Sequence, residues 1–334
     1  MISYQKKIII NWLWSGLLLV ILMIAVGGIT RLTQSGLSMV DWKLIEGAIP
    51  PLNETDWEEE FNKYKQYPEF QIVNSRMTLP EFKKIFFWEY IHRLLGRIIG
   101  IVFIIPFVFF WYQKWINNYQ KKRFIILLFL GAFQAFLGWF MVQSGLVDVP
   151  AVDHLRLAAH LCTAFFLACY IYWLILDNSK IKRTNNNRFK KLSISLIFLL
   201  SIQIVFGAFT AGLKAGYLID RKKSYIENIF GNNRISGDEI DLFNNPYDVQ
   251  FIHKIYAWII FFLIIYLYKK SINTIYQKNV KIILLFVLIQ LFLGLATFLC
   301  SMQINLAVAH QVNAIMLLLS IVHLYFTSTQ KSRS

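Results

Sequence analysis

Cysteine is rare in this chain, with only three residues among 334. Cys162, Cys169 and Cys300 all fall within long apolar runs, and no polar connecting segment contains one. This placement excludes a disulfide framework, and no two of them have the CxxC spacing of a metal or redox site. We therefore expect all three thiols to behave as small buried apolar side chains.

Charged residues are also scarce, because Asp, Glu, Lys and Arg make up only 16% of the chain, whereas 57% of it is hydrophobic. This composition, with a mean hydropathy of +0.49, excludes an ordinary soluble domain. Runs of about 20 apolar residues have the length that spans a bilayer. The sequence therefore predicts an all-α polytopic membrane protein. The eight predicted spans are 8–30, 87–112, 124–146, 154–176, 192–213, 249–268, 280–300 and 304–326.

Acidic residues are nearly absent from one set of connections. The net charge of +15 is concentrated before the first span, after the last, and in the second, fourth and sixth connections, where Asp177 is the one acid. The positive-inside rule then places both termini and these connections in the cytoplasm. The basic balance thus reflects membrane topology and not nucleic-acid binding. The cations are Lys6, Lys7, Lys114, Lys121, Lys122, Arg123, Lys180, Lys182, Arg183, Arg188, Lys190, Lys191, Lys269, Lys270, Lys278, Lys281, Lys331 and Arg333.

The chain contains an internal repeat in which spans one to four correspond to spans five to eight. Residues 89–96 match 250–257, 157–161 match 307–311, and the close of the first span is echoed at 206–216. Because each half has an even number of spans, both halves have the same orientation in the membrane. The prediction is two tandem four-helix bundles, residues 1–176 and 192–334, joined by a basic cytoplasmic linker at 177–191.

Each even-numbered span carries a histidine in its outer half: His92, His160, His253 and His310. A pair of imidazoles projecting inward from two helices of a bundle is the arrangement that ligates a haem iron from both faces. A hydrogen-bonded core histidine, a proton relay or another metal site are the alternatives. Zinc or copper needs three or four ligands close together, whereas these residues form two separated pairs.

The two halves differ beside these histidines. Glu89, which shares a helix face with His92, is replaced in the second half by Gln250. This difference suggests that one half performs chemistry with protons or a cationic intermediate while the other holds a permanent electron-transfer haem. Arg93, Arg97 and Lys254 lie where they can pair with haem propionates or extend toward lipid headgroups.

The longest loop, residues 31–86, precedes the second span on the side opposite the basic loops. It carries an acidic stretch at 56–60, around which a short helix is expected. A loop of this length usually has a task of its own, as a lid or a docking surface, although a plain solvated connection fits as well.

The motifs together closely resemble those of the heme A synthase family, in the branch shared by mitochondria and Gram-negative bacteria. The resemblance covers nearly the whole chain and rests on residues 27–38, 88–93, 143–146, 156–161, 250–253 and 309–311. The other branch of that family has a cysteine pair in its extracytoplasmic loops, and this chain has none there. Thiol-mediated electron delivery is therefore not expected.

This resemblance implies oxidation of the C8 methyl group of haem O to a formyl group by successive hydroxylations. It implies that His92 and His160 bind the substrate haem and that Glu89 stabilises a cationic intermediate or moves protons. The cofactor haem b would lie between His253 and His310 as the electron relay. The implied partners are heme O synthase and an external electron donor, in a bacterial inner membrane, and the sequence permits a homo-oligomer.

Two other functions remain open from the residues alone. A dihaem b-type electron-transfer protein would hold two permanent haems and would not need Glu89. A transporter built from parallel repeats would have broken helices at mid-membrane and no iron. The Glu89/Gln250 difference argues against the first alternative. The fourfold histidine register argues against the second.

Overall fold

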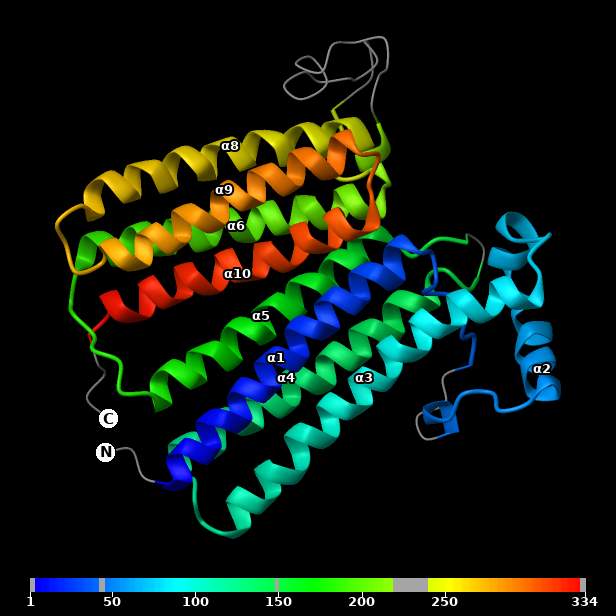
Figure 1. Ribbon diagram of the computed structural model, residues 1–334, viewed down its shortest axis with the longest axis horizontal. Helices are drawn as coiled ribbons and strands as arrows, with labels where there is room; N and C mark the ends of the chain where they lie inside the picture. The colour runs from blue at the N-terminus through cyan, green and yellow to red at the C-terminus, as the bar shows by residue number, and fades with distance from the viewer. Residues whose placement is uncertain (1–3, 42–45, 148–149, 219–239, 331–334) are drawn as a thin grey trace. The chain divides into compact units, whose positions relative to one another are not determined.

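A computed structural model describes residues 4–41, 46–147, 150–218 and 240–330 of the chain. Within these residues the fold is helical, and eight helices are long and apolar enough to cross a membrane (Figure 1). The predicted eight spans are confirmed. They are α1 (Tyr4–Leu32), α3 (Leu79–Tyr112), α4 (Asn118–Gln143), α5 (His154–Asn178), α6 (Asn187–Gly212), α8 (Pro246–Ser271), α9 (Gln277–Leu299) and α10 (Ile304–Ser328).

Most of these helices begin before their apolar run begins, because polar residues cap them. In α3 the backbone N–H of Thr78 donates to the Glu81 carboxylate at 2.8 Å, and Pro80 occupies the first turn. In α4 the side chains and backbones of Asn117 and Gln120 exchange hydrogen bonds. The helices therefore extend past the hydrocarbon-length segments, by eight residues at the start of α3.

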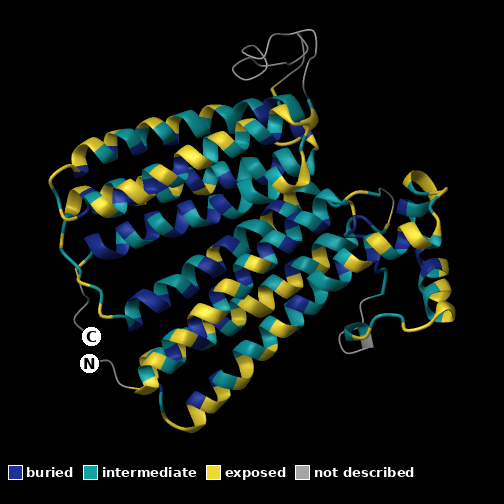
Figure 2. Cartoon of the chain, in the orientation of Figure 1, coloured by how far each residue is buried: buried dark blue, intermediate teal, exposed yellow. Residues whose placement is uncertain are grey.

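The second-half helices form a closed ring in which α6 packs against α8, α8 against α9, α9 against α10, and α10 against α6 (Figure 1). Leu196, Ile264, Ile283 and Ile315 are fully buried in this bundle. Burial of this kind runs along the facing sides of the helices, whereas the outward sides are apolar but exposed, as expected for contact with lipid (Figure 2). In the first half α3 packs against α4.

The chain forms two compact units, one of Trp14–Leu167 and one of Met1–Leu13 with Ala168–Ser334. The boundaries between these units fall inside α1 and α5. The predicted division of the chain at 177–191 and the common orientation of the halves stay predictions. Lys331 and Arg333, two of the cations used for the topology, lie outside the described residues.

The long first loop has a small core of its own. Helix α2 (Glu54–Tyr64), which confirms the expected short helix, packs against the outer turns of α3. Phe61, Tyr64 and Phe82 are buried there, with Met39 and Phe86 beside them. The loop is completed by the short helical turns η1 (Glu46–Ala48) and η2 (Glu69–Val73).

Candidate functional site

Each of the four predicted histidines packs against a glycine of the preceding long helix. A Cβ atom on any of these glycines would lie closer to the imidazole than ordinary van der Waals contact, so the ring would have to shift to admit it. The distances from the position of that Cβ to the nearest ring atom are 3.2 Å for Gly27 and His92, 3.1 Å for Gly138 and His160, 3.0 Å for Gly207 and His253, and 2.9 Å for Gly294 and His310.

The four helix pairs use these positions in the same register. Every one of the glycines lies five residues before the last residue of its helix. His160, His253 and His310 lie six or seven residues after the first residue of theirs, and His92 lies deeper because α3 begins further out. The chain therefore consists of four similar helix pairs, two in each half, which is a finer repeat than the sequence comparison indicated.

Within each half the two histidines lie near one another. His92 and His160 are close enough to interact electrostatically, and so are His253 and His310. The described residues contain no group of three or more His, Cys, Asp or Glu side chains placed to hold a metal ion. Each half therefore brings two imidazoles near one another.

Three glutamines that the sequence reasoning passed over also touch histidines. Gln134, Gln203 and Gln290 each lie one turn before the glycine on the same helix. The recurring spacing Gln-x-x-x-Gly was the available signal. The side-chain amide nitrogens contact the backbone oxygens of His160 at 3.0 Å and His253 at 2.9 Å, and ring Nε2 of His310 at 3.1 Å.

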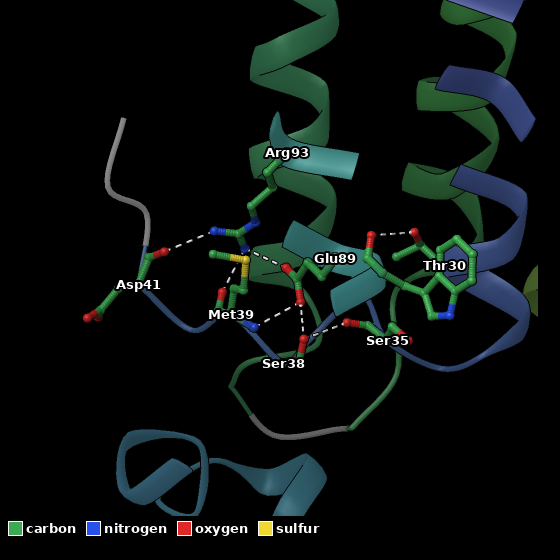
Figure 3. A network of polar contacts seen from close by, with 8 residues as sticks. Thr30, Ser35, Ser38, Met39, Asp41, Glu89 and Arg93 are labelled. Atoms are coloured by element: carbon green, nitrogen blue, oxygen red, sulfur yellow. Dashed lines mark hydrogen bonds and ion pairs between the residues drawn. The ribbon is translucent and has the colours of Figure 1, made fainter. Parts of the chain in front are cut away.

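Glu89 is buried and fully engaged in hydrogen bonds (Figure 3). Its Oε2 accepts from the Ser38 hydroxyl and from the Met39 backbone N–H, both at 2.8 Å, and its Oε1 accepts from Arg93 at 2.6 Å. Arg93 also donates to the backbone oxygens of Met39 and Asp41. The carboxylate therefore ties the segment that follows α1 to α3, and no described hydrogen bond joins it to His92.

Gln250 performs the equivalent task in the second half. It is buried, and its Nε2 donates to the backbone oxygen of Ala215 at 2.6 Å, in the segment that follows α6. Glu89 and Gln250 thus share a structural role, and what differs between the halves is the charge. In the first half Glu89 forms a buried ion pair with Arg93. At the corresponding positions of the second half, Gln250 is uncharged and the Lys254 ammonium lies over the ring of Phe298, 5.6 Å from its centroid.

Two further predicted residues, Arg97 and Lys254, lie on the histidine-bearing helices α3 and α8. Arg97 lies one turn further into α3 than Arg93 and is partly exposed, as is Lys254. His323, expected to be peripheral, contacts the Tyr172 hydroxyl at 2.9 Å through Nδ1.

Comparison with known proteins decides the family. Residues 10–322 match the model of a family described as cytochrome oxidase assembly protein. The chain belongs to this family. It is similar to proteins named heme A synthase from Flavobacterium johnsoniae (40% identity, 94% of this chain and 96% of the relative), Flavobacterium psychrophilum (42%, 94% and 96%) and Pelagibacter ubique (41%, 92% and 93%).

The family match covers both halves of the chain, and all four histidines with their glycines fall inside it. Membership agrees with the eight membrane-length helices, and the chain is a multi-pass membrane protein.

Proposed function

We propose that this protein is a heme A synthase, an oxidoreductase that converts the C8 methyl group of haem O to a formyl group by successive hydroxylations. The observation that carries the proposal is the similarity of about 40% identity over 94% of the chain to proteins of that name. The two histidine pairs support it, because they provide one pocket for a substrate haem and another for a cofactor haem.

The cofactor is haem b, held by His253 and His310, and it supplies one-electron transfer when bound. Nδ1 of each of these residues is buried and has no hydrogen-bond partner within the described part of the chain. A buried, unpaired ring nitrogen is costly unless a ligand satisfies the imidazole. The facing glycines leave the two rings free of methyl groups, so these residues would hold the iron of the haem.

The substrate haem binds at His92 and His160, which orient it in the first half. Glu89 lies one turn from His92 and supplies a carboxylate, paired with Arg93, where the other half has the uncharged amide of Gln250. Its carboxylate stabilises positive charge that develops at the methyl carbon or accepts a proton from it. Arg97 and Lys254, and Arg93 after release from its present partners, bind haem propionates.

The partners follow from the reaction. Haem O is made by heme O synthase, and the electrons come from an external donor. The basic loops predict a bacterial inner membrane with both termini cytoplasmic, which places the histidine pairs toward the outer face.

The test is haem A formation in a bacterial strain that lacks its own heme A synthase and expresses a heme O synthase. The protein should produce haem A, measured by extraction and chromatography. His92→Ala and His160→Ala should abolish haem A yet keep haem b, whereas His253→Ala should lose haem b itself. His323→Ala serves as a control for removal of an imidazole outside the pockets. Full haem b in the His253→Ala protein would refute the second pocket.

A further inference from the structure

We infer that Gln134, Gln203 and Gln290 are positioning residues for three of the haem-binding histidines, and that Met23, in the place of a fourth glutamine, leaves His92 the least constrained ligand. This inference rests on the proposed haem sites. It goes beyond them by assigning which residues fix each ligand and which pocket releases its haem.

The placement of the glutamines is systematic. A primary amide in the middle of a membrane-spanning helix is costly unless it finds a partner. Each of the three lies one helical turn before the glycine that faces a histidine, and therefore on the same side of its helix. The amide nitrogen of each glutamine contacts the histidine of the paired helix, at its backbone oxygen, its ring or both.

Two of these glutamines have a side-chain carbonyl oxygen that accepts no hydrogen bond within the described residues. Oε1 of Gln134 and Oε1 of Gln203 are buried and have no hydrogen-bond partner within the described residues, and Nδ1 of His253 is in the same condition. An imidazole that binds a metal through one nitrogen carries a hydrogen on the other and donates it to an acceptor, which fixes the ring and makes the ligand more basic. We assign the amide oxygens of these glutamines as that acceptor.

The third glutamine is itself held in place. Oε1 of Gln290 accepts a hydrogen bond from Asn313 at 2.7 Å, and Asn313 also donates to the backbone oxygen of Phe286 at 2.9 Å. The carbonyl oxygen of an amide has a second lone pair, so Gln290 can accept from His310 as well. Asn313 therefore fixes the amide of Gln290 beside His310.

The first helix pair departs from the pattern. Met23 lies one turn before Gly27, where the other three helices have glutamine, and its methyl carbon packs 3.2 Å from the position of a Cβ on Gly96. A thioether is flexible and only a weak acceptor, so it does not orient an imidazole as an amide does.

This difference matches the tasks of the two pockets. A cofactor haem stays in place, and both of its ligands, His253 and His310, have a glutamine. A substrate haem must enter and its product must leave, and one of its two ligands, His92, has none. The pocket that exchanges its haem is thus the one with a loosely held ligand.

The first test concerns the second pocket of the full-length protein with bound haem b. Gln203→Leu should weaken haem b retention about 10- to 100-fold, the usual effect of losing such a partner, and should raise the midpoint potential. Gln203→Glu, a stronger acceptor, should lower that potential. Ser201→Ala, which removes a hydroxyl from the exposed side of the same helix, should change neither. A purely structural role would not produce shifts of opposite sign.

The second test concerns release from the first pocket. Met23→Gln should slow transfer of the bound haem to a haem-scavenging globin about tenfold or more. Leu22→Gln, which adds an amide to the exposed side of the same helix, is the matched control and should release haem at the original rate. Equal release rates in the Met23→Gln and original proteins would overturn the role of Met23.

The outcomes separate this inference from the proposed function. If His253→Ala keeps haem b, the pocket itself is wrongly assigned. If His253→Ala loses haem b while Gln203→Leu keeps the original retention and potential, the pocket stands and the glutamine role is wrong. Should Gln203→Leu fail to accumulate, the same substitutions at Gln290 decide the question, and an unchanged potential there overturns the inference.

Discussion

At the scale of single residues, each histidine depends on the glycine opposite it. The sequence revealed the histidines because they stand out in apolar spans, but it did not reveal their glycines, since small residues are frequent in membrane helices for many reasons. Which glycine faces which ring depends on helix packing. The repeated Gln-x-x-x-Gly spacing is present in the sequence, but only the contacts in the structure show that these glutamines meet the histidines.

We expect Gly207→Ala to expel or displace haem b, because the added methyl group would lie 3.0 Å from Cε1 of His253. Overpacking of this kind typically costs about 1–3 kcal/mol, which weakens haem binding by roughly one to two orders of magnitude. The haem b content of purified protein, from its reduced-minus-oxidised spectrum, is the measurement. Gly131→Ala is the control, because nothing lies within 4 Å of its added Cβ. Equal haem content in both variants would contradict this account.

Glu89 has a structural role, as hydrogen-bond acceptor for the segment after α1, and a proposed role in the reaction through its charge. Two substitutions distinguish these roles. Glu89→Ala leaves the buried guanidinium of Arg93 without its carboxylate, a change that typically costs about 3–5 kcal/mol, and it should loosen residues 35–41 in hydrogen exchange. Haem b should stay bound while conversion stops at haem O or its alcohol. Glu89→Gln keeps an acceptor for Ser38 and Met39 but removes the charge. Normal haem A output from Glu89→Gln would remove the carboxylate from the mechanism.

At the scale of elements, the apolar runs located every membrane helix but not its ends. Polar capping residues such as Asn117 and Asn186 start helices before the hydrophobic pattern begins, and α3 carries its first eight residues beyond the predicted span. The sequence predicted α2 from its acidic run. It did not predict that the loop folds around its own core, because Tyr64 and Phe82 meet only after α2 folds back on α3.

The small core of this loop should lose stability at alkaline pH. Burial, with help from the neighbouring Glu69 carboxylate, raises the pKa of Tyr64, whose hydroxyl donates to Glu69 at 2.9 Å. A group with a raised folded-state pKa contributes stability that is complete below its unfolded pKa, about 10, and is lost as the pH rises above that value. Proteolysis of the segment around α2 should therefore accelerate above about pH 10. Tyr64→Phe should remove this acceleration, and an unchanged pH profile in that variant would exclude Tyr64 as its cause.

At the scale of the whole molecule, charge and repeat together predicted the architecture. Eight spans followed from run length, because the bilayer imposes a fixed length on each helix. The repeat indicated two halves, and the structure shows that each half contains two similar helix pairs. The pairing of each histidine with its glycine was not predictable, because it depends on side-chain packing in helices that are apolar on every side.

The predicted orientation can be measured with single cysteines in a Cys162→Ser, Cys169→Ser, Cys300→Ser background. An impermeant thiol reagent added to intact cells with a permeabilised outer membrane should label Asn62→Cys and Asn244→Cys, which replace exposed residues of the external loops. It should label Lys182→Cys and Asn273→Cys only after lysis. External labelling of Lys182→Cys would reverse the topology and place the histidine pairs toward the cytoplasm.

The central claim is that the first half binds a haem that is converted and released, whereas the second half retains haem b as a cofactor. It is tested most directly by extracting and chromatographing the haems bound to purified protein, expressed with and without a heme O synthase. We predict haem b alone without the synthase, and haem b together with hydroxylated haem and haem A when the synthase is present. Haem b alone under both conditions would contradict the account and indicate a dihaem electron-transfer protein.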